Sequence, residues 1–338
     1  MVTPFDAAPI GVLLVNLGTP DAPEPQAVRR YLAEFLSDPR VVELPKLFWA
    51  PALHGIVLPL RAQKSAQAYA AIWNKELNDS PLRAITRAQA EGLAERMRSG
   101  ASGASPVLVD FAMRYGAPSL QAGLTGLMSR GCERILIMPL YPQYAAATTA
   151  TAFDAVARIL GGMRRQPTLR FLPPYFDDPA YIDALASSLR AGVAALDFEP
   201  EVMLASFHGL PRSQVDAGDP YKAQCEASWR LLREAMGVSE RQLRLSFQSR
   251  FGRAKWIEPY TTEVVKALAR EGVKRLVVMT PGFSADCLET LEEIGLELRD
   301  EFLQEGGEKF ARITCLNDGE EGMRLLETLA RRELQGWA

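Results

Sequence analysis

The stretch EVMLASFHG, residues 201–209, decides the fold, because it is a continuous apolar run that ends in a histidine and a glycine. Three other runs have the same character: GVLLVNLG (11–18), RILIMPLY (134–141) and RLVVMTPGF (275–283). A strand that is apolar throughout, rather than at alternate positions, is typical of a parallel sheet covered on both faces. Each run has a Gly or Pro at or near its end, where we expect a turn.

Segments with helical patterns separate these runs. They include PEPQAVRRYLAEFLS (23–37), PSLQAGLTGLMSRG (118–131) and EPYTTEVVKALAREG (258–272). An alternation of short buried strands with helices favours a doubly wound α/β fold.

The two halves of the chain repeat each other imperfectly. GVLLVNLGTP is similar to EVMLASFHGLP, DFAMRYG to LSFQSRFG, and GCERILIMPLYP to EGVKRLVVMTPGF. The second similarity aligns Arg114 with Arg250, and the first half carries about 50 additional residues before it. We therefore predict two similar Rossmann-like lobes, each with a parallel four-stranded sheet, and a cleft between them outside the carboxyl ends of the strands.

We place the N-terminal lobe at residues 8–160 and the C-terminal lobe at residues 161–338. The first lobe includes an apolar insert at residues 41–80, which accounts for its additional length. Whether the C-terminal helix packs back on the first lobe is left open at this point.

The composition excludes several classes of function. The net charge of the 338 residues is −3, so no global positive field favours nucleic acid. The four cysteines lie far apart without a CxxC pair, which argues against a disulfide framework or a cysteine zinc site and fits the cytoplasm. No apolar stretch reaches the length of a membrane span, and neither a nucleotide-binding glycine motif nor a GxSxG elbow occurs.

His208 is one of only two histidines, and it stands at the carboxyl end of a predicted strand. Ligands of open α/β sheets bind at these strand ends. An imidazole there can act as a general base near neutral pH or as a ligand for Fe, Zn, Co or Ni. The alternative is a core or turn histidine that is hydrogen-bonded to the backbone.

An acidic segment follows the last of the four apolar runs. Glu289, Glu293 and Glu297 are spaced by four, so they line one face of the predicted helix, and Asp286 either caps this helix or extends the acidic line. Like charges at this spacing destabilise a helix, and no lysine is interleaved. The face is therefore either solvated or suited to conduct or bind a divalent cation. With one histidine it would form an open ligand set for transient handling of a metal.

The insert also has two interpretations. Its apolar residues either pack in a core or form an exposed lip with a basic rim at Arg61 and Lys64, suited to a flat hydrophobic ligand or a membrane interface. These apolar residues are Phe48, Trp49, Leu53, Ile56, Val57, Leu58 and Leu60.

At this point the chain resembles the ferrochelatase family, in particular its proteobacterial members that act on protoporphyrin. The resemblance spans roughly residues 10–320 and rests on segments that occur in the family's order. These are LLVNLGTPDAP, FLSDPRVVELP, DFAMRYG, MPLYPQY, SFHGLP, QSRFGRAKWIEPYT and CLETLEEI. The resemblance implies a fold of the class II chelatase type, with two lobes.

The resemblance also implies roles for individual residues. His208 matches a metal ligand and proton acceptor, and Glu289 matches the second metal-site residue. Glu293 matches the next carboxylate along an acidic path for protons or metal, which Glu297 and Asp286 would extend. The positions implied to contact porphyrin, with the arginine at 61 suited to a propionate, are Leu17, Arg61, Tyr69, Ser80, Arg114, Tyr115, Tyr144 and Trp256.

The activity implied is that of a lyase in heme biosynthesis, which inserts Fe(II) into protoporphyrin IX and releases two protons. Fe(II) is then a substrate, and no cofactor is expected to be bound permanently. Some family members hold a [2Fe-2S] cluster, but Ala146 stands at one cluster-cysteine position and the tail RRELQGWA has no cysteine, so no cluster of that type is expected.

Two alternatives to this activity stay open. One is another class II chelatase, acting on coproporphyrin or on a cobalt or nickel tetrapyrrole, and the other is a tetrapyrrole-binding protein without catalysis. The location expected is the cytoplasm, with contact between residues 47–60 and the inner membrane as a further hypothesis, because protoporphyrin is poorly soluble.

Overall fold

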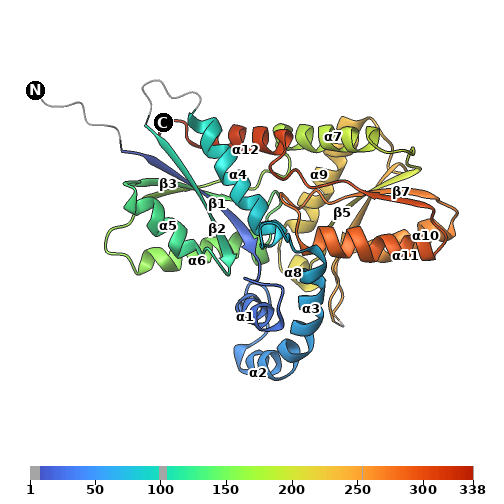
Figure 1. Cartoon of the computed structure of the whole chain (residues 1–338), viewed down its shortest axis with the longest axis horizontal. Helices are drawn as coiled ribbons and strands as arrows, with labels where there is room; N and C mark the ends of the chain where they lie inside the picture. The colour runs from blue at the N-terminus through green and yellow to red at the C-terminus, as the bar shows by residue number, and fades with distance from the viewer. Residues whose placement is uncertain (1–7, 99–104, 253, 338) are drawn as a thin grey trace, which may run out of the picture. The chain divides into compact units, whose positions relative to one another are not determined.

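A computed structural model describes residues 8–98, 105–252 and 254–337. They form two four-stranded sheets in which every pairing of neighbouring strands is parallel (Figure 1). The first has the order β2-β1-β3-β4, with β1 Ile10–Gly18, β2 Val107–Tyr115, β3 Arg134–Pro139 and β4 Thr168–Phe171. The second has the order β6-β5-β7-β8, with β5 Val202–His208, β6 Leu243–Gln248, β7 Arg275–Met279 and β8 Lys309–Arg312. The predicted α/β class and the four-stranded parallel sheets are confirmed.

The four apolar runs of the sequence are β1, β3, β5 and β7, which are the two inner strands of each sheet. Inner strands are paired on both edges and covered by helices on both faces, so nearly every side chain is apolar and buried. The outer strands β4 and β8 have four residues each, and their side chains are half-buried or exposed. These two outer strands therefore lack a continuous apolar run in the sequence.

Helices connect the strands, and three of the helical segments are of the π type. The helices that precede β4 are α1 Pro25–Leu36, α2 Lys46–Ala52, η1 Leu53–Val57, α3 Leu58–Ile72, α4 Pro81–Arg98, α5 Leu120–Ser129, η2 Ala146–Ala150 and α6 Thr151–Gly161. Those that follow it are α7 Pro179–Ala194, α8 Arg212–Asp216, α9 Tyr221–Met236, α10 Thr261–Arg270, η3 Glu289–Leu298, α11 Arg299–Gln304 and α12 Glu320–Glu333. π-Helical segments are rare and occur frequently at functional sites.

The chain forms two compact units that are interleaved in sequence. The first comprises the described residues up to Leu140, the segment Ala146–Pro173 and the described residues from Met323 onward. The second comprises Tyr141–Ala145 and Pro174–Gly322. Strand β4 follows residue 160 and pairs with β3, so the first sheet is complete only at residue 171. Helix α12 contributes to the first unit, where Glu327 forms an ion pair with Arg96 of α4 at 3.3 Å.

The strand registers show how the two halves correspond. In the first sheet the register places Leu17 opposite Arg114, and in the second it pairs His208 with Gln248. If Leu17 corresponds to His208, then Arg114 corresponds to Gln248. The alignment of Arg114 with Arg250 is therefore two residues out of register, because the second half has extra residues between its strand end and the glycine turn.

The insert forms α2, η1 and α3, and its apolar residues divide into two groups. Leu53 and Leu58 are completely buried. Leu47, Phe48 and Leu60 are 80%, 74% and 72% exposed. The insert thus has both a packed side and an exposed apolar side. Among the described residues, we find no helix whose length and hydropathy would allow it to cross a membrane.

Candidate active site

His208 is the last residue of β5, and its side chain is half-buried. Its Nδ1 lies 2.6 Å from the carbonyl oxygen of Gly209. A carbonyl oxygen only accepts hydrogen bonds, so Nδ1 must donate. The neutral imidazole therefore carries its free lone pair on Nε2, which is the atom available to accept a proton or bind a metal.

Two aromatic rings lie beside the imidazole. The ring centroids of Trp256 and Phe283 are 6.5 and 6.4 Å from that of His208. Gly209 permits the approach of Trp256, since a Cβ at this position would lie 3.1 Å from the indole and 2.7 Å from the carbonyl oxygen of Gln248. The imidazole is therefore held in a setting that is apolar on two sides and suits a flat ligand.

The acidic segment begins after β7, which neighbours β5 in the second sheet. Strand order in such a sheet reverses between these two strands, and ligands bind at this switch point outside the carboxyl ends. Both His208 and the loop that leads from β7 into η3 lie there. Gln248 fixes the start of η3, because its Nε2 donates to the carbonyl oxygen of Glu289 at 2.9 Å. The side-chain oxygen Oε1 of Gln248 accepts a hydrogen bond from the hydroxyl of Ser206 at 2.8 Å.

Glu293 is held by Ser249, the residue that follows β6. The backbone N–H of Ser249 donates to one carboxylate oxygen at 2.7 Å and its hydroxyl donates to the other at 2.5 Å. Ser249 has a φ of 65°, a left-handed conformation that is uncommon for residues with a side chain. The strained backbone thus aims two donors at one carboxylate.

The electrostatics of Glu293 link it to the other predicted site residues. Burial raises the pKa of Glu293 above its ordinary value of 4.5, and the negative charge of Glu289 raises it further. The hydrogen bonds from Ser249 and the charge of His208 oppose this rise in pKa. The three side chains therefore lie close enough to influence one another, and the carboxyl group of Glu293 can take up a proton more readily than a solvated glutamate.

The raised pKa of Glu293 predicts a specific pH dependence of stability. The folded protein binds this proton more tightly than the unfolded chain, so the free energy of unfolding falls as pH rises from 4.5 through the folded pKa. In the variant Glu293→Gln the side chain does not titrate, so this loss of stability with rising pH does not occur. We expect the variant to gain stability relative to the unmodified protein between pH 4 and pH 7, as measured by urea unfolding. A difference in free energy that is constant with pH would contradict the assignment.

The two other acidic residues predicted for the site, Asp286 and Glu297, have different surroundings from Glu293. The carboxylate of Asp286 is bound by Arg312 at 2.6 Å, by Thr290 at 2.8 Å and by Asn317 at 2.8 Å. It therefore braces the start of η3 instead of presenting free oxygens. Glu297 lies further along η3 and is exposed.

Cys287, two residues before Glu289, is buried. Burial raises the pKa of its thiol well above the ordinary value, and the charges of Glu289 and Cys315 raise it further. Cys287 therefore carries a protonated thiol, which is a weak metal ligand. Across the described residues, no three His, Cys, Asp or Glu side chains are grouped so that they could hold a metal ion.

The positions that the resemblance links to porphyrin contact differ in exposure. Leu17, Arg61, Tyr144 and Trp256 are half-buried. Burial lowers the pKa of Arg61. By contrast, Tyr69, Ser80 and Tyr115 are buried, at 7%, 1% and 1% exposure. The hydroxyl of Ser80 accepts a hydrogen bond at 3.3 Å from the backbone N–H of Arg83 at the start of α4, which is the role of a helix cap.

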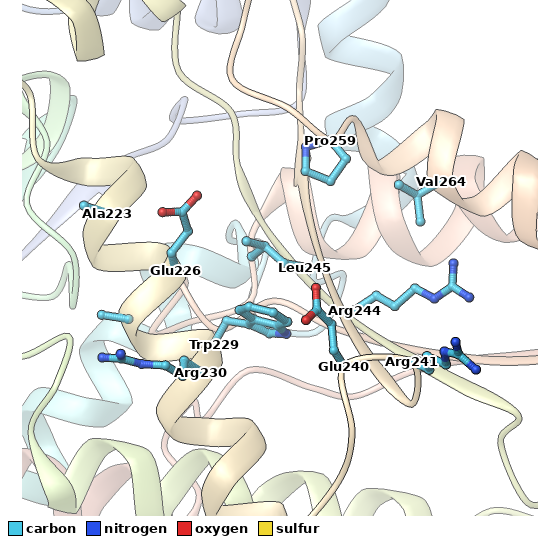
Figure 2. Close-up of a pocket in the computed structure, with 11 residues that line it drawn as sticks. Ala223, Glu226, Trp229, Arg230, Glu240, Arg241, Arg244, Leu245, Pro259 and Val264 are labelled. Carbon is cyan, nitrogen blue, oxygen red and sulfur yellow. The ribbon is translucent and has the colours of Figure 1, made fainter.

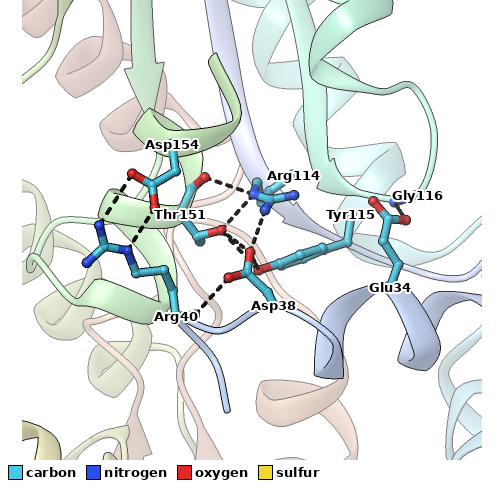
Figure 3. Close-up of polar contacts among 8 residues, drawn as sticks. All are labelled: Glu34, Asp38, Arg40, Arg114, Tyr115, Gly116, Thr151 and Asp154. Atoms are coloured by element: carbon cyan, nitrogen blue, oxygen red, sulfur yellow. Dashed lines mark hydrogen bonds and ion pairs between the residues drawn. The ribbon is translucent and has the colours of Figure 1, made fainter. Parts of the chain in front are cut away.

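Arg114 and Tyr115 belong to a polar network of the first unit (Figure 3). The guanidinium of Arg114 binds Asp38 at 2.5 Å and lies 4.3 Å from the centroid of the Tyr115 ring. It also donates to the hydroxyl and carbonyl oxygens of Thr151, at 2.8 and 3.0 Å. These two predicted contact residues are thus already engaged within their own unit.

The structure adds Gln248, Ser249 and Phe283 to the residues around His208. None of these residue types is distinctive in the sequence. The signal that points to Gln248 and Ser249 is their place at the end of LSFQS, the repeat segment that pairs with the strand of His208. A prediction of the strand pairing would have brought them to the site.

A separate cavity of about 970 Å³ lies on the outer side of β6 (Figure 2). Its wall includes Trp229 and Arg230 of α9, Leu245 of β6 and Val264 of α10. None of the site residues predicted from the sequence lines it.

Comparisons with known proteins agree with these features. The family model described as Ferrochelatase matches residues 9–334. A protein named Ferrochelatase from Methylocella silvestris is 56% identical over 329 residues, which cover 97% of this chain and 94% of the relative. Another of that name, from Rhizobium meliloti, is 56% identical over 328 residues, covering 97% and 96%.

Among solved structures, the fold is similar to that of SirB from Bacillus subtilis with Fe³⁺. The TM-score is 0.56 at 12% identity, and the match covers 96% of this chain and 95% of SirB. At this identity the likeness concerns the fold alone.

Proposed function

The chain belongs to the ferrochelatase family, and from this premise we propose that it inserts Fe(II) into protoporphyrin IX, giving protoheme and two protons. The observation that supports this most is the setting of His208. Its Nε2 lone pair is free, aromatic rings flank it, and the carboxylates of Glu289 and Glu293 lie nearby at the same sheet edge.

The chemistry needs such a base because a free porphyrin carries two pyrrole protons that leave as the metal enters. We assign their acceptance, one proton at a time, to Nε2 of His208, because this nitrogen carries the lone pair of the imidazole and histidine is the commonest general base. Nδ1 stays committed to the carbonyl oxygen of Gly209, so the ring keeps one tautomer and one orientation. The same Nε2 serves as a ligand for the incoming metal before the proton is taken up.

Glu289 and Glu293 would then carry protons away from the imidazole or guide Fe(II) toward it. The raised pKa of Glu293 supports a role in proton transfer, because its carboxylate takes up a proton more readily than that of a solvated glutamate. We leave Asp286 out of this path, since its oxygens are bound by Arg312 and its neighbours.

The substrate contacts proposed are those whose side chains are half-buried. They are Leu17, Arg61, Tyr144 and Trp256, and the planar guanidinium of Arg61 suits a propionate. No family-type iron–sulfur cluster is part of the proposal, because Ala146 replaces one of its cysteines.

The experiment that tests the function is anaerobic incubation of the protein with protoporphyrin IX and Fe(II), followed by absorbance. A parallel panel of Co(II), Ni(II) and Zn(II), each with protoporphyrin, coproporphyrin and sirohydrochlorin, tests the metal and the ring. We expect iron insertion into protoporphyrin to be efficient. Activity confined to Co(II) with sirohydrochlorin would assign the chain to another chelatase function, and binding without insertion would make it a carrier.

We also propose that the exposed apolar side of the insert contacts the inner membrane, in a protein otherwise located in the cytoplasm. Phe48 and Leu60 expose 74% and 72% of their surfaces there, and burial of such a side chain contributes about 1.5–3 kcal/mol. The double variant Phe48→Ser/Leu60→Ser should therefore sediment with phospholipid vesicles at least about tenfold less than the unmodified protein.

The matched control for this prediction is Leu303→Ser in the second unit. Leu303 is 40% exposed but stands outside the insert, so its replacement should leave vesicle binding unchanged. Equal binding by the double variant and the unmodified protein would argue against membrane contact through the insert.

A further inference from the structure

We propose that Asp38 is a positioning residue, which fixes the point where the insert leaves the first unit. Asp38 lies between α1 and the insert, and one carboxylate oxygen accepts three hydrogen bonds. The donors are Arg114 at 2.5 Å, the hydroxyl of Tyr115 at 3.0 Å and the hydroxyl of Thr151 at 2.5 Å. The other oxygen accepts the backbone N–H of Arg40 at 2.8 Å.

The donors come from three separate segments, as Figure 3 shows. Arg114 and Tyr115 end β2, and Thr151 begins α6. Arg40 belongs to the turn that leads from α1 into the insert. The side chains of Asp38 and Arg114 are only 8% and 10% exposed. One buried carboxylate thus joins the sheet, a helix and the entry to the insert. Hydrogen bonds to a buried charged group are stronger than those between neutral groups and fix the geometry of their partners.

The electrostatics agree with this geometry. Burial alone would raise the pKa of Asp38, but the hydrogen bonds from Thr151, Arg40 and Tyr115 and the charge of Arg114 outweigh it and lower the pKa. Asp38 is therefore ionised throughout the neutral range, and the network is fully formed there.

The far end of the insert is held in a similar way. Asp79 is 5% exposed and binds Arg83 at 2.6 Å and Arg87 at 2.7 Å, both on α4. Between these two anchored ends, α2 has no buried residue and carries the exposed Phe48. A buried carboxylate thus holds each end of the insert, in addition to the packing of Leu53 and Leu58 in its middle.

The consequence for substrate rests on the proposed function, in which Arg61 of the insert meets a propionate. A loosened entry would let Arg61 sample other positions, which weakens porphyrin binding without touching the imidazole that accepts protons. The proposal also gives Arg114 a role within the first unit, because its guanidinium holds Asp38.

The test uses Asp38→Asn in the full-length protein. Hydrogen exchange of amides in residues 41–80 should accelerate about tenfold, which corresponds to about 1.4 kcal/mol of local opening. Exchange in β5 and β7 of the second unit should not change. In the same variant, KM for protoporphyrin should rise about fivefold while kcat stays within about twofold.

The matched control is Asp154→Asn, which breaks the ion pair with Arg40 on the same entry segment. That pair is 45% and 44% exposed, so its loss should leave exchange and KM unchanged. Unchanged exchange in residues 41–80 of Asp38→Asn, or faster exchange spread evenly over the first sheet, would overturn the proposal. If the unmodified protein inserts no metal, the proposed function fails, and the exchange data still decide the role of Asp38.

A second variant with a smaller structural change distinguishes local loosening of the insert from loss of the whole fold. Thr151→Val keeps the shape of the side chain but removes one donor to Asp38 and one acceptor of Arg114. We expect a smaller acceleration of exchange, confined to the same residues 41–80. Acceleration elsewhere but not in the insert would contradict the proposal for this variant as well.

Discussion

His208→Ala is expected to lower the rate of Fe(II) insertion into protoporphyrin about a thousandfold, because a positioned general base contributes 10²–10⁴-fold. The same substitution removes the Nε2 ligand from the incoming metal. Porphyrin affinity should change less than about threefold, since Trp256 and Phe283 stay in place and supply the apolar surface. Absorbance under anaerobic conditions measures insertion, and quenching of tryptophan fluorescence measures binding.

His54→Ala provides the matched control for this variant. His54 is the only other histidine, and it lies exposed in η1 of the insert. Its replacement should leave insertion in detergent solution unchanged. If His208→Ala kept insertion within tenfold of the unmodified rate while porphyrin affinity fell, the imidazole would be a binding group and the proposed base would have to be sought elsewhere.

Arg312→Met is expected to lower the free energy of unfolding by about 3 kcal/mol, because it leaves one charge of a buried ion pair without its partner. The side chains of Arg312 and Asp286 are 15% and 6% exposed, and their atoms are 2.6 Å apart. Methionine retains the aliphatic part of the arginine, so little packing is lost. Urea unfolding measures the difference.

Because Asp286 also binds Thr290 of η3, loosening the pair should disturb the start of the helix that carries Glu289. We therefore expect the rate of metal insertion to fall as well. Arg299→Met breaks an ion pair with Asp300 that is 42% and 54% exposed, and this control should cost well under 1 kcal/mol. Equal stability of the two variants would show that the pair at Asp286 does not brace the fold.

The inner strands of both sheets could be predicted from the sequence, whereas an outer strand such as β8 could not, for a physical reason. A strand such as β5 is paired on both edges, so apolar side chains fill it and mark it in the sequence. The outer strand β8, KFAR, has no fully buried residue, and nothing in its composition separates it from a loop. Its existence depends on pairing with β7, which is a tertiary interaction.

The candidate site divides in the same way. His208 was predictable because it ends an apolar strand, and Glu289 because it stands in an acidic segment after another. Ser249 could not be predicted, because its importance lies in a left-handed backbone conformation that aims two donors at Glu293. The engagement of Arg114 by Asp38 is equally invisible in the sequence, since 76 positions separate the two residues.

The interleaving of the two units has a consequence for how the chain is made. Synthesis runs from the N-terminus, and domains generally fold as they emerge from the ribosome. Here the second unit has all its residues at Gly322, whereas the first still lacks those of α12, including the buried Leu326 and Leu329. The unit whose synthesis begins first is therefore the last to become complete, and its apolar surface under α12 stays uncovered until α12 has been synthesised.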